Sequence, residues 1–191
     1  MDLSLTDTHR MVARMARDFA EKEIAPDIKE YDRAHQVHRE ALRRMAELGF
    51  LGICLPVRYG GQGMDYVSLG LVCEELERID TSLRVVMSVH VGLNCLGLFQ
   101  WATEEQKQRF LVPQARGERI ATYGLTEPGA GSDAVSIVTR AHREGDVYVL
   151  SGEKMWISLA DVADTFLIFA KTDPQAEPAY RGISAFIVQR E

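Results

Sequence analysis

The spacing of apolar residues changes once along this chain, near Gly117, and that change limits the folds open to it. Before it, apolar side chains recur every three or four residues, as in amphipathic helices. After Arg119, short runs rich in β-branched and aromatic residues alternate with turn residues, as in strands. We therefore expect an α+β fold of two domains, with residues 1–117 all-helical and residues 118–191 built from β-strands.

The helical half carries clear start signals. Thr6 or Asp7, then Asp65, and later Thr103 stand where an N-cap is expected, each ahead of an apolar run with helical spacing. Residues 81–101 are apolar nearly all round. Such a pattern predicts a helix buried in the middle of its domain.

The second half contains several strand patterns separated by turn residues. Arg-Glu-Gly-Asp at residues 143–146 predicts the turn of a hairpin. We expect strands at residues 120–126, 137–142, 147–151, 154–158, 165–171 and 183–188.

Composition excludes some classes of protein. With 46% hydrophobic residues, a chain of 191 residues can bury a substantial core. A net charge of −6 argues against a nucleic-acid surface, which needs clustered Lys and Arg. No apolar run approaches the roughly 20 residues of a membrane span, and the start lacks the pattern of a signal peptide. Three cysteines without a Cys-x-x-Cys motif indicate buried thiols in a reducing compartment, so we expect a cytoplasmic protein.

The loop between the two halves, Tyr-Gly-Leu-Thr-Glu-Pro-Gly-Ala-Gly-Ser-Asp at residues 123–133, concentrates unusual backbone chemistry. Gly129 and Gly131 allow positive φ and a close approach of a ligand to the backbone. Thr126 and Ser132 add hydroxyl groups. A loop of this kind can hold a polar cofactor through successive N–H groups, or it can be a plain turn between strands.

This loop, together with Gly-Glu-Lys-Met-Trp-Ile-Ser at residues 152–158, resembles the flavin-binding middle domain of the acyl-CoA dehydrogenase family. The resemblance continues at residues 48–53, Pro56, 59–63, Gly70, 74–76 and 103–108, and so at several ordered motifs across nearly the whole chain. It implies an N-terminal all-helical domain and an antiparallel, sandwich-like or barrel-like β middle domain. The C-terminal helical bundle of the family is expected to be absent from this chain.

The resemblance implies FAD as the cofactor. Hydroxyl and amide groups of the loop would hold the flavin edge, where negative charge develops as hydride arrives. The indole of Trp156 would cover the flavin, although a Trp in a strand read alone is more often a core residue. The cofactor contacts implied are Tyr123, Leu125, Thr126, Gly131, Ser132, Trp156, Ile157 and Ser158.

Arg84 is a charged residue in an otherwise apolar helix, and Ser88 lies on the same face. Residues 77–89 resemble the glutaryl-CoA dehydrogenase branch of the family, which implies that Arg84 and Ser88 meet a carboxylate at the far end of the substrate. Ser132 would also contact the acyl-CoA. Alternatively, Arg84 pairs with Glu77 or Asp80 and reaches solvent. Both interpretations remain open at this point.

The resemblance implies an oxidoreductase that oxidises the α,β bond of a short acyl-CoA, for example glutaryl-CoA, by hydride transfer to flavin N5. An electron-transfer flavoprotein is the implied acceptor and a homotetramer the implied assembly. No carboxylate here matches the catalytic base of the family, so no catalytic residue is assigned, and the chain by itself is expected to be inactive. No histidine has metal-ligand spacing. The alternatives are a flavin oxidase or monooxygenase on the same fold, or a truncated relative acting in binding or assembly.

Overall fold

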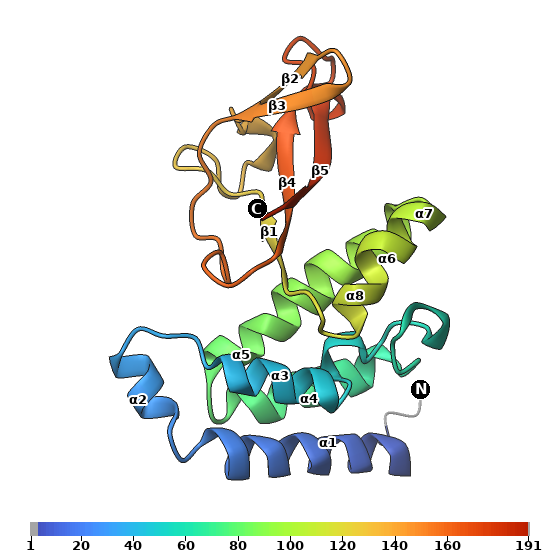
Figure 1. Ribbon diagram of the computed structural model, residues 1–191, viewed down its shortest axis with the longest axis vertical. Helices are drawn as coiled ribbons and strands as arrows, with labels where there is room; N and C mark the ends of the chain where they lie inside the picture. The colour runs from blue at the N-terminus through green and yellow to red at the C-terminus, as the bar shows by residue number, and fades with distance from the viewer. Residues whose placement is uncertain (1–3, 191) are drawn as a thin grey trace. The chain divides into compact units, whose positions relative to one another are not determined.

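The computed structural model describes residues 4–190, which form a helical unit up to Ile120 and a β unit from Ala121 onward (Figure 1). The helices precede the strands in the chain, so the predicted fold class, a helical part followed by a β part, is confirmed. Each unit has its own buried apolar residues.

The helical unit contains eight α-helices among its described residues. They are α1 (Asp7–Phe19), α2 (Ile28–Arg33), α3 (Arg39–Glu47), α4 (Tyr66–Glu77), α5 (Thr81–Val86), α6 (Leu96–Trp101), α7 (Glu104–Gln106) and α8 (Val112–Ala115). Wider π-helical turns occupy Ala20–Ile24, Met87–Cys95 and Lys107–Leu111, and 3-10 turns occupy Phe50–Gly52 and Val57–Tyr59.

The helix starts follow the predicted caps. The Thr6 hydroxyl accepts a hydrogen bond from the His9 amide, the Asp65 carboxylate from the Ser68 amide, and the Thr103 hydroxyl from the Gln106 amide. Each bond satisfies an amide that has no partner inside its helix. The predicted starts at Thr6, Asp65 and Thr103 are therefore confirmed, whereas α2, which buries no side chain, was not predicted.

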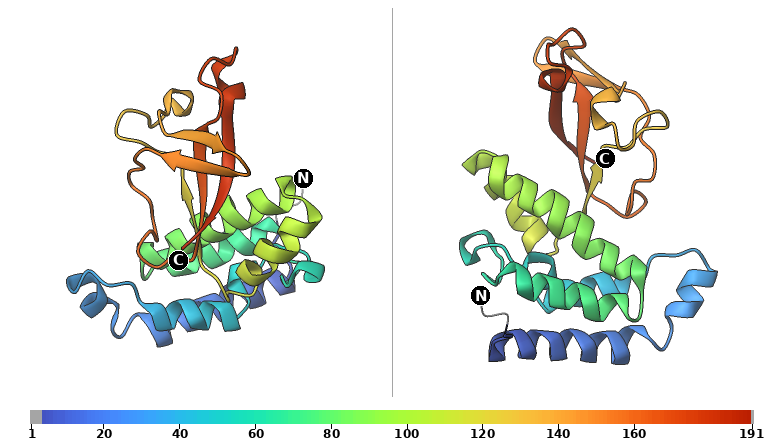
Figure 2. Two further views of the ribbon diagram at one scale, coloured as in Figure 1. Left: turned by 45° about the horizontal axis from the view of Figure 1, so that its top comes forward. Right: turned by 180° about the vertical axis from the view of Figure 1, so that it is seen from behind.

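The apolar segment Thr81–Trp101 forms one continuous helix through α5, the π-helical turn and α6 (Figure 2). One side of it is buried, with Leu83, Met87 and Val91 among its contacts with the core, but Leu93 is 44% exposed and Trp101 86%. The prediction of a helix buried in the middle of its domain therefore holds for one face and is wrong for the other.

Among the described residues, Thr81–Trp101 is also the one helix with the length and hydropathy needed to cross a membrane. Core helices of globular proteins meet the same criterion, and 44% of the most apolar part of Thr81–Trp101 is buried in this structure. The expectation of a protein without a membrane span stays a prediction.

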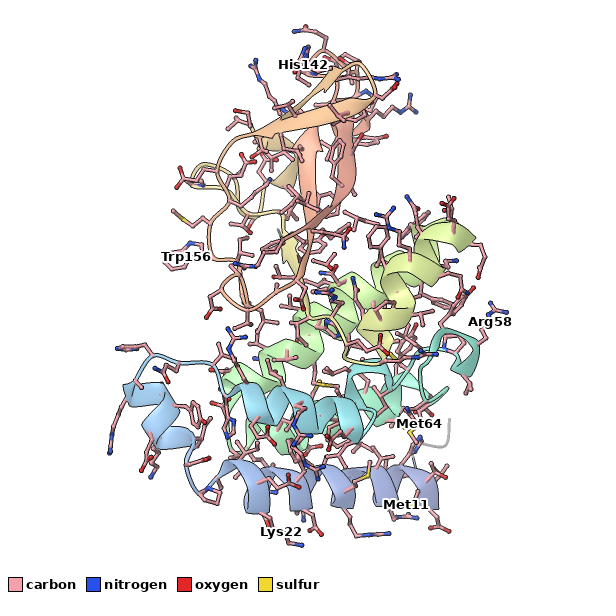
Figure 3. The ribbon with its side chains drawn as sticks, in the orientation of Figure 1. Met11, Lys22, Arg58, Met64, His142 and Trp156 are labelled. Atoms are coloured by element: carbon pink, nitrogen blue, oxygen red, sulfur yellow. The ribbon has the colours of Figure 1, made fainter. Side chains whose placement is uncertain are left out.

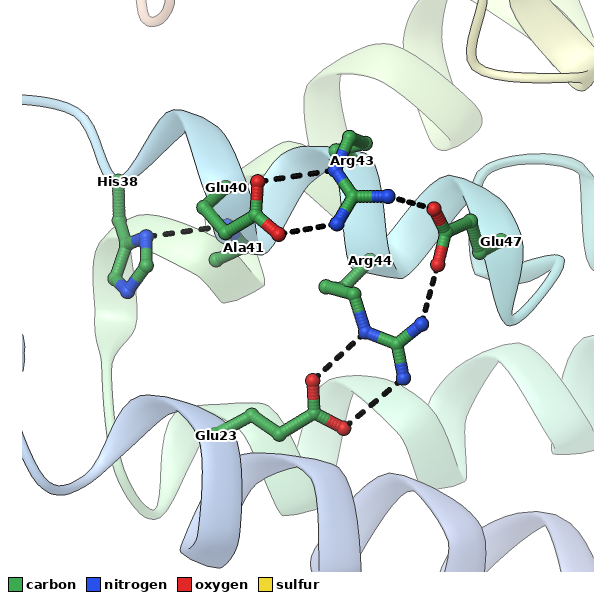
Figure 4. A network of polar contacts seen from close by, with 7 residues as sticks. All are labelled: Glu23, His38, Glu40, Ala41, Arg43, Arg44 and Glu47. Carbon is green, nitrogen blue, oxygen red and sulfur yellow. Dashed lines mark hydrogen bonds and ion pairs between the residues drawn. The ribbon is translucent and has the colours of Figure 1, made fainter.

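Charged side chains link α3 to the π-helical turn after α1 (Figure 4). Arg44 donates from Nε to the Glu23 carboxylate at 2.8 Å, and Arg43 binds Glu40 and Glu47 on its own helix. These groups are largely exposed, so each pair contributes little to stability.

The β unit contains one mixed five-stranded sheet. Its strands are β1 (Ala121–Gly124), β2 (Arg140–Glu144), β3 (Val147–Ser151), β4 (Thr165–Lys171) and β5 (Ile183–Gln189). β4 is the central strand, with β5 along one side and with β1 and β2 following each other along the other. β2 and β3 form the predicted hairpin, and the positive φ of Gly145 allows its tight turn.

The expectation of an antiparallel β domain needs correction in its strand directions. β1 pairs parallel with β4, with Ala121 opposite Thr165, and β2 meets β4 in the parallel sense as well. Parallel neighbours require a long crossover, here the segment from the loop after β1 through the hairpin to β4. Residues 121–190 therefore form a single mixed sheet.

The predicted strand at residues 154–158 is also wrong. Trp156 has φ of 58° and Leu159 has φ of 64°, values that an extended strand does not contain. The segment instead makes irregular hydrogen bonds to the loop after β1, which a pattern of apolar residues does not reveal.

Candidate functional site

Two segments far apart in the sequence lie side by side in the β unit. The amide of Met155 donates to the carbonyl oxygen of Thr126 at 2.9 Å. The hydroxyl of Thr122, on β1, donates to the carbonyl oxygen of Ser158. The hydroxyl-bearing loop after β1 and the Trp156–Ser158 segment, both assigned from the sequence to one flavin site, are therefore neighbours.

The loop after β1 is closed by its own backbone. The Glu127 amide donates to the Ala130 carbonyl oxygen at 3.0 Å, and the Ala130 amide donates to the Glu127 carbonyl oxygen at 3.1 Å. Gly129 and Gly131 are exposed, and a Cβ atom added to either would meet no other atom within 4 Å. Neither glycine has a positive φ, so their contribution is open space beside the backbone rather than an unusual turn.

The predicted contacts around the loop differ in exposure. Tyr123, Leu125 and Thr126 are half-buried, whereas Gly131 and Ser132 are exposed. The Tyr123 ring packs at a tilt on the ring of Phe169, with 5.0 Å between centroids. The end of the loop at Gly131 and Ser132 is therefore more open to a ligand than its start at Tyr123.

Trp156 is the most exposed aromatic side chain of the described β unit, at 84%, and Figure 3 shows its ring standing away from the sheet. The alternative that it is a core residue is wrong within this chain. An indole of this exposure offers a broad apolar plate to a planar ligand. Trp156 and Leu159 both have a positive φ, so Ile157 and Ser158 lie between two residues in the left-handed region. This backbone conformation is unfavourable by about 1–3 kcal/mol for each of the two residues.

A buried ion pair, absent from the sequence-based assignment, connects the two segments. Lys154 Nζ lies 2.7 Å from Glu127 Oε1, and the two side chains are only 10% and 2% exposed. Burial raises the pKa of the Glu127 carboxyl, but hydrogen bonds from Lys154 and from residues 138 and 139 outweigh burial and hold the pKa at about 2. The sequence offered one indication of this ion pair: each of the two flavin-site motifs contains a charged residue, Glu127 in one and Lys154 in the other.

In the helical unit, Arg84 contacts both Glu77 and Ser88. Its Nε donates to the Glu77 carboxylate, and its Nη1 donates to the Ser88 hydroxyl at 3.1 Å. The Arg84 bond lowers the pKa of Glu77. The Arg84 side chain is still 31% exposed. The pairing with Glu77 that the alternative expected is present. The contact of Arg84 and Ser88 with a substrate carboxylate stays a prediction.

His90, the histidine within the apolar helix Thr81–Trp101, has a structural partner. His90 is fully buried and lies 3.0 Å from the Gln114 carbonyl oxygen, which agrees with the interpretation as a core histidine. Residues 4–190 contain no group of three or more His, Cys, Asp or Glu side chains arranged to hold a metal ion. The Cys95 thiol is buried, which raises its pKa.

Comparisons with known proteins give matches along nearly the whole chain. The model of the acyl-CoA dehydrogenase N-terminal domain matches residues 6–118, and that of the acyl-CoA dehydrogenase middle domain matches residues 122–191. The short-chain specific acyl-CoA dehydrogenase of Clostridium acetobutylicum is 42% identical over 190 residues, which cover 100% of this chain and 50% of that protein.

Solved structures agree. A chain from a study of the electron transferring flavoprotein of Acidaminococcus fermentans and of flavin-based electron bifurcation has a TM-score of 0.94 and 43% identity, covering 100% of this chain and 50% of that one. A glutaryl-CoA dehydrogenase of Mycobacterium smegmatis in complex with FADH2 has a TM-score of 0.89 and 34% identity, covering 97% and 46%. This chain spans about half the length of the curated relatives that it matches.

Proposed function

The chain belongs to the acyl-CoA dehydrogenase family, and we propose that it supplies the N-terminal and middle domains of an FAD-dependent enzyme that oxidises the α,β bond of a short acyl-CoA. One observation carries the proposal: two hydroxyl-bearing segments lie side by side, next to an exposed indole. Bound FAD would supply the acceptor for the hydride that leaves the β-carbon.

The residues present fit such a cofactor. Thr126, Ser132 and Ser158 carry hydroxyl groups on half-buried or exposed backbone. Open space beside Gly131 lets a ring edge approach the main chain. Trp156 presents an apolar plate that would exclude water from one side of a planar ring. Tyr123, Leu125 and Ile157 would complete the contacts.

The FAD proposal is tested by titrating the purified protein with FAD and following flavin absorbance. We expect Thr126→Ala and Ser158→Ala each to weaken FAD binding about tenfold, because each removes one hydrogen-bond donor to the ring. Ser151→Ala, which removes an exposed hydroxyl on β3, is the matched control and should leave the affinity unchanged. A protein that binds no FAD, or two variants that bind as well as the unaltered protein, would contradict the proposal.

For the substrate, we propose a short acyl-CoA with a carboxylate at its far end, such as glutaryl-CoA. Arg84 and Ser88 support it, since a guanidinium with an adjacent hydroxyl suits a carboxylate. Glu77 already engages Nε of Arg84, so a substrate carboxylate would meet the remaining nitrogens of a guanidinium held in place. Ser132 would contact the acyl-CoA from the β unit.

The substrate proposal predicts a selective effect of Arg84→Gln in the complete enzyme as it occurs in the cell. Anaerobic bleaching of the flavin by glutaryl-CoA should become at least about tenfold slower, because one charge-assisted contact is lost. Bleaching by butyryl-CoA should not change. Arg14→Gln, at an exposed position on α1, serves as the control. Bleaching of the unaltered enzyme by butyryl-CoA alone would remove the glutaryl-CoA proposal and leave the reaction class.

Three further parts of the proposal concern the whole protein. A carboxylate base would come from the part of the enzyme that relatives carry beyond this region, since none of the carboxylates here is assigned to that role. An electron-transfer flavoprotein would accept the electrons, and a homotetramer in the cytoplasm is the assembly that we propose. A flavin oxidase would instead consume oxygen and form peroxide.

A further inference from the structure

Three consecutive residues of the loop after β1 are each bonded to Lys154 or Met155. Lys154 Nζ donates to the carbonyl oxygen of Leu125 at 3.0 Å and to the carboxylate of Glu127 at 2.7 Å. Between these two contacts, the Met155 amide donates to the carbonyl oxygen of Thr126 at 2.9 Å. Thr126 is therefore held at its own backbone and at both of its neighbours.

The Glu127 carboxylate carries the connection to a third segment. It accepts hydrogen bonds from the amides of Val138 and Thr139, the latter at 3.0 Å, just before β2 begins. Thr139 is in turn tied to the sheet, because its carbonyl oxygen accepts from the Lys171 amide at the end of β4. One buried carboxylate thus joins the loop after β1, the entry to β2 and Lys154.

Stability alone does not explain a buried ion pair at this place. Well-packed apolar side chains of similar volume are often as stabilising as a buried pair, because burying two charges costs much of what their attraction returns. An ion pair adds geometric specificity, because its hydrogen bonds form only when donor and acceptor lie in a defined relative position. Such specificity matters at this place because Trp156, directly after Met155, has a positive φ. A backbone of this kind persists only where neighbouring contacts hold it.

We propose that Lys154 and Glu127 are positioning residues, whose buried ion pair sets the loop after β1 and the Trp156–Ser158 segment in the relative geometry that a planar cofactor needs. The cofactor part of this inference rests on the proposed function. The part that concerns the two segments holds for the protein without any ligand. The positive charge of Lys154 and the negative charge of Glu127 cancel, so the pair adds no net charge to the site.

Amide hydrogen exchange in the ligand-free protein tests the inference directly. The reporter amides are those of Glu127, Ala130 and Met155, because each is hydrogen-bonded within the two segments. In Lys154→Met, we expect these amides to exchange at least about tenfold faster, while amides of the β4–β5 ladder stay protected. The double variant Glu127→Gln with Lys154→Met leaves no unpaired charge, so it carries the test if the single variant does not fold.

Glu75→Gln is the matched control, since Glu75 is a buried carboxylate with two arginine partners in the helical unit. It should lower thermal stability without changing exchange at the three reporter amides. Unchanged exchange at these amides in the folded double variant would overturn the inference. Equal loss of protection throughout the β unit would overturn it too, because the pair would then act on stability alone.

A titration with FAD separates this inference from the proposed function. If the unaltered protein binds FAD, the double variant should bind at least about tenfold more weakly and Glu75→Gln within about twofold of the unaltered protein. Equal FAD affinity in the double variant would overturn the positioning role. If the unaltered protein does not bind FAD, the proposed cofactor fails, and the exchange experiment still decides whether the pair positions the two segments.

Discussion

Glu75 on α4 shows how much one carboxylate can organise in the helical unit. Its side chain is 5% exposed and accepts from Arg17 Nε at 3.0 Å, from Arg17 Nη2 at 2.7 Å and from Arg78 Nη1 at 2.8 Å. Arg17 lies on α1, so the paired bonds link α1 to α4. The Arg17 bond is the main cause of a lowered Glu75 pKa, against the opposing effect of burial.

We expect Glu75→Gln to destabilise the protein by about 1.5–3 kcal/mol, because hydrogen bonds to a charged group are lost and the amide matches only part of their geometry. Urea unfolding followed by circular dichroism measures the change. Glu74→Gln, at the exposed neighbouring position, should change stability by less than about 0.5 kcal/mol. Equal effects of the two variants would show that burial of Glu75 is not what matters.

At the scale of an element, α4 contains one residue that destabilises the helix. Gly70 lies in the helix interior, is exposed, and has no neighbouring atom within 4 Å of an added Cβ. Glycine in a helix interior is unfavourable because the unfolded chain loses more conformational freedom on folding.

Gly70→Ala should therefore stabilise the protein by about 0.5–1 kcal/mol, seen as a higher urea midpoint with an unchanged slope. Gly117→Ala provides the contrast. Gly117 has φ of +71°, and a Cβ there would lie 2.3 Å from the Cβ of Ala46, so this variant should be destabilised. A destabilised Gly70→Ala would mean that α4 tolerates no side chain at this position.

At the scale of the whole molecule, acid should remove stability from both units. Glu127 in the β unit and Asp65 in the helical unit each have a folded pKa of about 2, against ordinary values of 4.5 and 3.8. The Asp65 pKa is lowered mainly by the Ser68 amide and by His9. A depressed folded pKa stabilises the folded state above the ordinary pKa, and this contribution is lost as pH falls toward about 2.

We therefore expect the free energy of unfolding to fall by about 2 kcal/mol between about pH 6 and about pH 3, mainly through Glu127, measured by urea unfolding at each pH. Asp65 contributes less, because its side chain is 56% exposed and solvent screens its contacts. The double variant Glu127→Gln with Lys154→Met should show a smaller fall, because Glu127 no longer titrates. A variant with the same pH dependence as the unaltered protein would mean that Glu127 takes up no proton on unfolding in this range.

Much of the helical unit follows from local pattern. Thr6, Asp65 and Thr103 cap helices where the sequence places them, because a cap depends on a side chain and an amide three residues away. Gly49 ends α3 with φ of 76° for a similarly local reason. Periodicity also revealed the continuous helix Thr81–Trp101, but the exposure of its face around Leu93 depends on what packs there, which periodicity does not contain.

The candidate site divides in the same way. Hydroxyls and glycines in the loop after β1 were visible as motifs, and so was Trp156. The pairing of Lys154 with Glu127 was not, since it joins residues far apart in sequence whose charges alone would indicate exposed positions. The backbone of Trp156 was misread as a strand because its positive φ is imposed by contacts outside the segment.

By itself, the sequence determined the division into a helical part and a β part, where three of the helices begin, and which residue types gather in two motifs. Only the tertiary structure decided that β1 runs parallel to β4, that the two motifs lie side by side, and that a buried ion pair joins them. The physical reason is the distance along the sequence over which each interaction acts. Caps and periodicity act over three or four residues, whereas these pairings form only when distant segments are brought together by burial of a shared core.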